Sequence, residues 1–82
     1  MRIDKFMNAV NITKRRSIAQ DMLANKVIAI NDKIVKPSKN VEIGDIITIT
    51  YLESQKKYEV LKIPQTKSTS KSLQDSFIKD VS

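Results

Sequence analysis

Hydrophobic residues near the start of the chain recur at the spacing of one helix face. Four of them stand at positions i, i+3, i+4 and i+7: Ile3, Phe6, Met7 and Val10. This spacing is typical of a buried stripe on an α-helix, and polar side chains fill the other positions. The pattern predicts a first helix that Asn11–Thr13 end and turn, because Asn and Thr readily bond their own backbone outside helices.

A second helix with its own apolar stripe is predicted after this turn. The stripe consists of Ile18, Ala19, Met22 and Leu23. Ser17 followed by Gln20 has the form of a capping box, while Thr13 is the rival N-cap. Asn25 is predicted to end the helix, because Asn tolerates the left-handed conformation that is common there. The large apolar side chains of both helices are interpreted as core rather than as a cofactor site.

From residue 27 the hydrophobic period changes to two. Two short β-rich runs, residues 27–30 and 33–35, are separated by Asn31-Asp32, which predicts a hairpin. The strongest strand pattern of the chain is Ile46–Tyr51, and Tyr58–Ile63 is predicted to pair with it. The tyrosines in these two runs are interpreted as cross-strand packing residues rather than as stacking platforms for bases.

The length of the chain, 82 residues, predicts one small domain over residues 1–64. After Pro64 the stretch "QTKSTSKS" has the Ser, Thr and Lys bias that is typical of an unordered segment. Residues 65–82 are therefore predicted to form a flexible basic tail. At most a marginal helix is expected there, around Leu73, Phe77 and Ile78.

The residue inventory excludes several kinds of chemistry. The chain contains no Cys and no His, which removes disulfides, thiolate nucleophiles, the usual zinc ligands and imidazole acid–base catalysis. A single Gly excludes a Gly-rich phosphate loop, and the acidic residues form no pair at catalytic spacing. We therefore expect no enzyme activity, cofactor or metal. No signal peptide or membrane-spanning run is recognisable, so a cytoplasmic protein without membrane contact is expected.

The net charge is +6, and residues 1–26 hold six cations against two anions. Nucleic acid or an anionic membrane surface is the natural partner of such an excess, although a merely solvated basic face is the alternative. Three of the cations, Lys14, Arg15 and Arg16, stand in a row at the start of the second helix, where the helix dipole opposes them. Cations, free backbone N–H groups and the dipole together predict a phosphate contact.

Several stretches occur in an order that is similar to a known family: "MRIDKF", "KRRSIA", "KVIAIND" and "KPSKNVEIGDII". Over residues 1–51 the chain resembles the RNA-binding domain first described in small-subunit ribosomal protein four, the S-four domain or alpha-L RNA-binding motif. The resemblance implies an α+β fold in which two N-terminal helices pack on a small, mostly antiparallel β-sheet. It also implies that a basic face on the helices and the first hairpin binds structured RNA.

The resemblance carries candidate RNA-binding residues onto this chain. They are the basic, helix-start and polar-loop positions of the motif together with one acid: Arg2, Asp4, Lys5, Lys14, Arg15, Arg16, Ser17, Lys36, Ser38 and Lys39. Asp4 has two interpretations, either a weak surface pair with Arg2 or a group that orients a neighbouring arginine toward RNA. Asn25 and Asp32 depart from the usual Gly of the family, but both residue types tolerate positive φ.

The chain carries no separate catalytic domain and most resembles the stand-alone heat-shock and ribosome-quality-control branch, the RqcP-like proteins. This implies a monomer that binds ribosomal RNA and tRNA on the large ribosomal subunit carrying obstructed peptidyl-tRNA. There it would help a companion tailing factor extend the stalled chain. Two alternatives stay open: a heat-shock factor that recycles free large subunits without chain extension, or a protein-binding adaptor that uses the sheet face or the tail.

Overall fold

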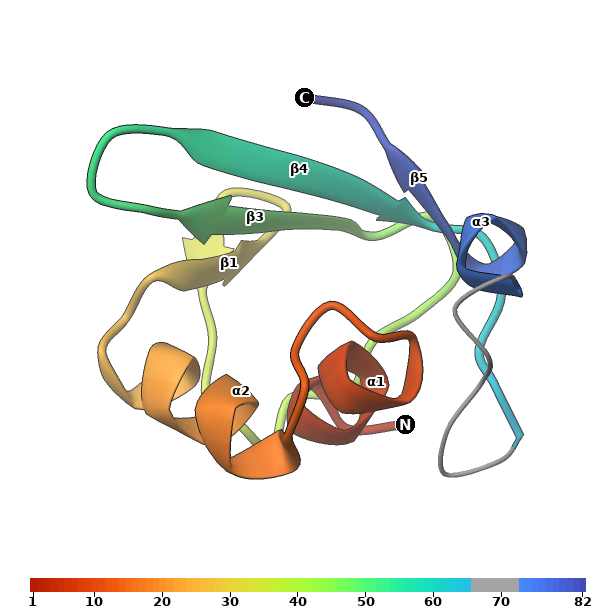
Figure 1. Ribbon diagram of the computed structural model, residues 1–82, viewed down its shortest axis with the longest axis horizontal. Helices are drawn as coiled ribbons and strands as arrows, with labels where there is room; N and C mark the ends of the chain where they lie inside the picture. Colours follow the sequence, from red (N-terminus) through yellow and green to blue (C-terminus); the bar gives the residue numbers. More distant parts are fainter. Residues whose placement is uncertain (66–72) are drawn as a thin grey trace.

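Two helices lie against one face of an antiparallel β-sheet in the computed structural model, which describes residues 1–65 and 73–82 (Figure 1). In chain order the elements within these residues are α1 (Ile3–Ala9), α2 (Arg16–Ala24), β1 (Ile28–Ile30), β2 (Lys33–Ile34), β3 (Ile46–Thr50), β4 (Gln55–Val60), α3 (Gln74–Phe77) and β5 (Ile78–Asp80). The strand order is β2-β1-β3-β4-β5, and every neighbouring pair is antiparallel. The expected α+β fold is confirmed. No helix in the described residues is long and apolar enough to cross a membrane.

The predicted stripe of α1 lies at the centre of the core. All four of its residues are fully buried, and the core also takes Ala19 and Leu23 from α2. The strands contribute Ile28, Ile30, Ile47, Ile49, Val60 and Ile78. Ile18, predicted to share the α2 stripe, is instead 41% exposed. The helix-spacing pattern is therefore confirmed for α1, while the buried stripe of α2 is narrower than expected.

The start of α2 differs from both predicted caps. The N-cap is Arg15, whose backbone is extended and which makes no side-chain capping bond. The Thr13 hydroxyl donates to the Arg15 carbonyl at 3.2 Å instead of capping a helical N–H. The Gln20 side chain, expected to complete a capping box with Ser17, bonds to Asp4 on the other helix. Both predicted caps were wrong, because a nearby backbone carbonyl accepts the Thr13 hydroxyl and a carboxylate on the other helix accepts the Gln20 amide.

The hairpin between β1 and β2 turns at Asn31-Asp32, as predicted. Both residues have positive φ, 51° and 69°, which is the conformation of a type I′ turn. The Asn31 side chain also accepts the Ile46 N–H at 3.0 Å, so the turn is joined to the start of β3. At the end of α2 the prediction was wrong in detail. Asn25 has a φ of −81°, and Lys26 adopts the left-handed conformation with a φ of 61°.

Strands β3 and β4 pair as predicted, but β4 begins earlier in the chain than expected. Strand β4 covers Gln55–Val60 rather than Tyr58–Ile63, because the Tyr51 N–H donates to the Ser54 carbonyl at 2.8 Å and closes a tight connection. Tyr58 lies opposite Ile47 and packs against the core, which confirms its interpretation as a packing residue. Tyr51 is 46% exposed at the hairpin end.

The last ten residues are part of the fold, which corrects the prediction of a flexible tail for this segment. Strand β5 pairs with β4, with Val60 opposite Ile78, and Ile78 is 3% exposed. The Gln74 side chain donates to the Val10 carbonyl at 2.9 Å, which ties α3 to the end of α1. The sequence did not indicate this strand, because three residues are too few for a visible period and their partners are distant in the chain. The expected unordered residues 66–72 lie outside the described residues.

Replacing Ile78 by Ala is expected to lower the free energy of unfolding by about 2–5 kcal/mol, because the substitution leaves a cavity in the core. Val81→Ala, in the same segment but 39% exposed, should change it by less than about 0.5 kcal/mol. Urea denaturation of the full chain measures both values. Equal, small effects of the two substitutions would show that β5 contributes nothing to the core.

Candidate nucleic-acid interface

Asp4 is a carboxylate in the first turn of α1 with no exposed surface. An acidic side chain at this position suits the positive end of the helix dipole. Its Oδ1 accepts the backbone N–H of Lys5 at 2.8 Å. Burial of a charge costs free energy unless hydrogen bonds and opposite charges compensate it. The remaining partners of the carboxylate therefore decide whether the arrangement is stable.

The second oxygen of Asp4 accepts three side-chain hydrogen bonds. Arg2 donates from Nη2 at 3.3 Å, Arg16 from Nε at 3.1 Å, and Gln20 from Nε2 at 3.1 Å. Arg16 and Gln20 are four residues apart and so share one face of α2. The carboxylate thus joins the start of α1 to α2 and fixes the positions of two cations at the same time.

Both arginines retain donors for a ligand. Arg16 bonds to Asp4 through Nε, so its two terminal nitrogens take no part in that bond. The side chain of Arg16 is 40% exposed. The side chain of Arg2 is 43% exposed. Because Asp4 is buried, the interpretation of Arg2 and Asp4 as a surface pair is wrong. The geometry agrees with the alternative, in which the carboxylate orients its neighbouring arginines.

Opposing effects act on the pKa of the Asp4 carboxyl. Burial raises the pKa, because the charged form loses hydration. Hydrogen bonds from Gln20, Arg16 and the Lys5 N–H, with the charge of Arg16, lower it by more, so the pKa lies below its ordinary value of 3.8. Asp4 is therefore an anion at neutral pH, and its charged form stabilises the folded state.

Lys14 and Arg15 lie in the segment that leads into α2, and both are exposed. Within residues 1–65 and 73–82, no ion pair holds either side chain. Ser17 is exposed in the first turn of α2 beside them. The structure thus gathers three cations at the start of α2, of which Arg16 is held by an anion while Lys14 and Arg15 extend into solvent.

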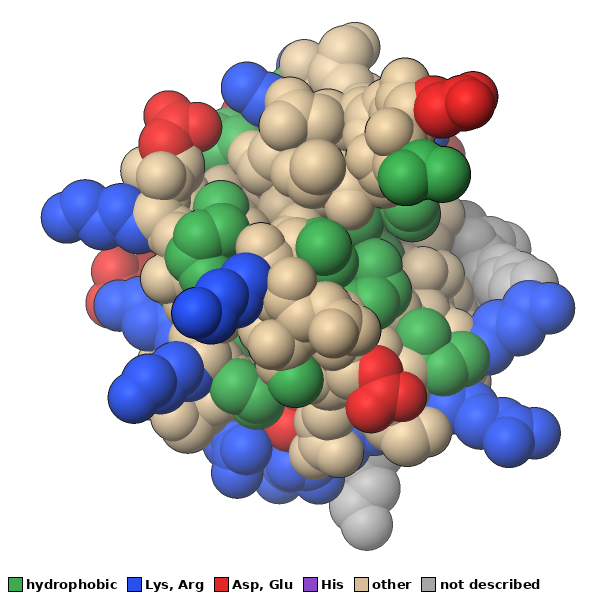
Figure 2. Space-filling view, turned by 90° about the vertical axis from the view of Figure 1, so that its left-hand side faces the viewer, with side chains coloured by type: hydrophobic (Ala, Val, Ile, Leu, Met, Phe, Trp, Pro, Cys, Tyr) green, Lys and Arg blue, Asp and Glu red, His purple; other side chains and the backbone are tan. Residues whose placement is uncertain are grey.

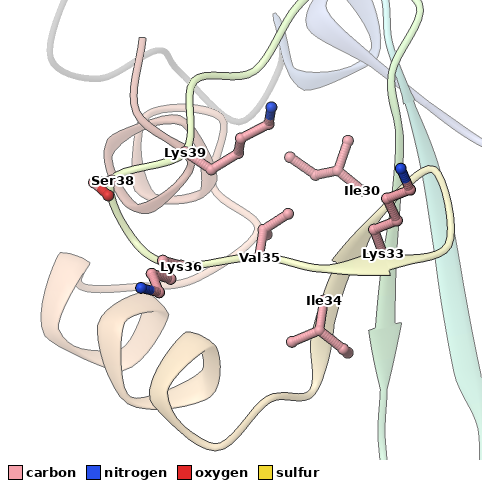
Figure 3. A pocket seen from close by; sticks show the side chains of 7 residues that line it. All are labelled: Ile30, Lys33, Ile34, Val35, Lys36, Ser38 and Lys39. Atoms are coloured by element: carbon pink, nitrogen blue, oxygen red, sulfur yellow. The ribbon is translucent and has the colours of Figure 1, made fainter.

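The polar loop Lys36–Lys39 lies next to the start of α1. The Ile3 N–H donates to the Lys39 carbonyl at 2.7 Å, and Arg2 forms a β-bridge with Asn40. The candidate side chains of this loop are exposed, and Figure 3 shows how they extend from it: Lys36, Ser38 and Lys39. The loop and the Asp4 network are therefore neighbours through Arg2.

The candidate residues form one connected region, in which hydrogen bonds hold some side chains and leave others exposed. Asp4, Arg2 and Arg16 are held together by hydrogen bonds, while the cations at the start of α2, the polar loop and Lys5 are exposed around them. Gln20 belongs to this region, but sequence reasoning assigned it to a cap. The available signal was its position four residues after Arg16, which places both side chains on one helix face.

Comparison with known proteins gives consistent matches. A family model described as the S4 domain matches residues 1–47. The RQC P-site tRNA stabilizing factor of Helicobacter pylori strain J99 is 43% identical over 68 residues, which cover 83% of this chain and 81% of the relative. The trimeric structure of Vibrio cholerae Heat Shock Protein 15 has a TM-score of 0.88 at 28% identity, covering 99% of this chain and 81% of that one. The solution structure of hypothetical protein HP1423 has a TM-score of 0.86 at 35% identity, covering 100% and 98%.

Replacing Asp4 by Asn is expected to lower the free energy of unfolding at pH 7 by about 1–3 kcal/mol, because hydrogen bonds to a charged group are lost. The pKa of Asp4 is lowered by folding, so its stabilisation is complete well above the ordinary value of 3.8 and disappears as the pH falls through the folded-state pKa. The difference between wild type and Asp4→Asn should therefore be constant down to about pH 5 and shrink below about pH 4. Urea denaturation over a pH series measures it, and a difference that does not shrink would contradict the assignment.

Replacing Gln20 by Leu removes one of the three donors to the Asp4 Oδ2 and is expected to raise the pKa of Asp4 above the wild-type value. The carboxyl ¹³C chemical shift of Asp4, followed by NMR across the acid range, reports this pKa. Gln55→Leu is the matched control, because Gln55 bonds to Thr50 instead. If Gln20→Leu and wild type gave the same pKa, the proposed coupling between Gln20 and Asp4 would be wrong.

Proposed function

The chain belongs to the S4 domain family, and on that premise we propose that it binds ribosomal RNA and tRNA on the large ribosomal subunit. The proposed target is the subunit that carries an obstructed peptidyl-tRNA. There the protein holds the tRNA while a companion tailing factor extends the stalled chain. It acts in the cytoplasm, as a monomer, and by binding rather than by catalysis.

The observation that carries this proposal is the hydrogen-bond network around Asp4. One buried carboxylate holds Arg2 and Arg16, from different parts of the chain, on the same oxygen. An arginine held in this way loses little side-chain freedom when it binds, and its remaining N–H donors suit two oxygens of one phosphate. Such a pre-ordered pair supports recognition of a folded RNA backbone, where the positions of the phosphates define the shape.

The exposed cations around the network supply the rest of the proposed contact surface. Lys5, Lys14 and Arg15 act through long-range attraction and phosphate contacts, and Ser17 offers a hydroxyl at the start of α2. On the other side of Arg2, the proposed contacts are Lys36, Ser38 and Lys39. Because these contacts are mainly electrostatic, affinity should fall steeply as salt is added.

The relatives support the ribosomal part of the proposal. The Helicobacter pylori protein is named for stabilising P-site tRNA, and the matched region includes most of both chains. The family match covers residues 1–47, which include all the candidate residues. This similarity favours peptidyl-tRNA on the large subunit over a free RNA as the target.

Recycling of free large subunits without chain extension is a second candidate. The similarity of the fold to a Heat Shock Protein 15 supports only the heat-shock part of this candidate. Cells that lack this protein distinguish the two functions. Stalled chains without added tails are expected if the protein supports tailing, whereas normal tails with accumulated free large subunits would favour recycling.

Arg16→Ala is expected to weaken binding to purified large subunits carrying peptidyl-tRNA by about tenfold or more, because a charge-assisted contact contributes about 1.5–3 kcal/mol. The slope of log Kd against log salt concentration should also decrease by about one, because one phosphate contact is lost. Titration of fluorescently labelled protein at several salt concentrations measures both quantities.

Lys79→Ala is the matched control for this titration. Lys79 is also an exposed cation, but it lies on β5, across the sheet from α2 (Figure 1). Its removal should leave affinity and salt slope nearly unchanged. Equal losses in the two variants would indicate attraction by net charge alone, and an unchanged affinity of Arg16→Ala would contradict the assignment of this residue.

A further inference from the structure

A groove follows the edge strand β2 and the residues after it. Two hollows, of about 410 and 290 Å³, share the residues Ile34, Val35 and Lys36. One hollow extends to Ile30 and Lys39, and the other extends to the end of α2. In Figure 3 the segment that the hollows share runs between these two regions. We call the two hollows and the segment between them the edge groove.

The floor of the edge groove is aliphatic. Ile34 is 57% exposed although it lies in a strand, and Val35 and Ile30 line the same hollow. Leu23, Ala24 and Pro37 line the other one. On the face that carries the α2–β1 and β3–β4 connections, hydrophobic side chains are spread across the middle with polar and acidic side chains between them (Figure 2). Lys and Arg side chains occupy the left, lower and right margins of this face.

The rim of the edge groove is positive. Four of its lining residues are lysines and none is acidic: Lys26, Lys33, Lys36 and Lys39. Among residues 1–65 and 73–82, no ion pair neutralises any of them. An occupant that combines aliphatic side chains with negative charge would complement both the floor and the rim.

The backbone of β2 offers hydrogen bonds at its outer edge. The Val35 N–H donates to the Ile28 carbonyl at 3.4 Å, and Ala29 lies opposite Ile34. Along an antiparallel strand, residues that bond to the partner strand alternate with residues whose N–H and C=O point away from it. Val35 is a bonded residue, so the preceding Ile34 is of the second kind. The polar backbone groups of Ile34 therefore point away from β1, where β2 has no further neighbour in the sheet order. Such an edge can accept another strand.

We propose that the edge groove binds an extended, acidic and aliphatic peptide segment of a partner protein as an added β-strand. Alternate side chains of a strand point to opposite sides, so aliphatic residues of the peptide would enter the hollows on the two sides of the shared segment. Carboxylates at the remaining positions would meet the lysines. This surface shares Lys36, Ser38 and Lys39 with the proposed RNA contact, whereas Lys33 and Ile34 belong to the edge groove alone.

The lining residues favour a peptide over RNA as the occupant. Bases of single-stranded RNA are usually recognised by stacking on aromatic rings or arginine planes, and none of the residues that line the groove is of these types. RNA also offers no ladder of alternating backbone donors and acceptors to match the Ile34 edge. An aliphatic floor with a free strand edge is instead the usual pattern of strand addition.

NMR titration of the ¹⁵N-labelled full chain tests this proposal. The probe is an eight-residue capped peptide of alternating Ile and Glu, and the matched probes replace either every Glu by Lys or every Ile by Ser. The amides of Lys33 and Ile34, which lie outside the proposed RNA contact, are expected to shift with the first probe, and affinity for either matched probe should be at least about tenfold lower. A folded RNA hairpin serves as a further probe. The absence of shifts with the Ile–Glu peptide, or shifts of these amides with the hairpin alone, would overturn the proposal.

Two variants give the residue-level test. Ile34→Asp places a negative charge on the floor of the groove and is expected to reduce affinity for the Ile–Glu peptide by about tenfold or more. Ile43→Asp makes the same change at another exposed isoleucine, 67% exposed and outside the groove, and should have little effect. Circular dichroism establishes that both variants are folded. Equal affinities of the two variants would overturn the assignment of the groove, while RNA binding measured in parallel reports separately on the proposed function.

Discussion

Asp4 carries a negative charge at a position with no exposed surface, between the start of α1 and the first turns of α2. A buried carboxylate is tolerated only when its hydrogen bonds are satisfied, and here one oxygen accepts a backbone N–H while the other accepts three side-chain donors. The same requirement determines where the two arginines lie. One carboxylate therefore joins the two helices and positions the two arginines at the same time.

The rest of the basic region is built outward from this network. The polar loop is tied to α1 through the Ile3 N–H and the Lys39 carbonyl, so the end of the loop lies beside Arg2. Beyond the loop, the positive surface continues along β2, where aliphatic side chains lie between the lysines. One continuous basic surface thus has two chemically different parts. The part around Asp4 suits phosphates, and the part along β2 suits a chain with aliphatic and acidic side chains.

Local patterns predicted most of the fold, while contacts between distant residues explain two of the errors. The stripe of α1 and the Asn31-Asp32 turn depend on neighbouring residues, and both were predicted correctly. The bond from Gln20 to Asp4 spans sixteen residues, and the bond from Gln74 to Val10 spans sixty-four, so neither leaves a periodic signal. For the site, residue types and family resemblance gave the candidate positions. They did not show that Asp4 is buried or that Arg16 bonds to it through Nε.

The most direct test of the central role of Asp4 is the affinity of Asp4→Asn for large ribosomal subunits carrying peptidyl-tRNA, compared with wild type at a pH and temperature where both are folded. The substitution makes the protein more positive by one charge, so attraction by net charge alone would strengthen binding. If the carboxylate orients Arg2 and Arg16 for RNA, binding should instead weaken by about tenfold. Equal or tighter binding by Asp4→Asn would contradict the account.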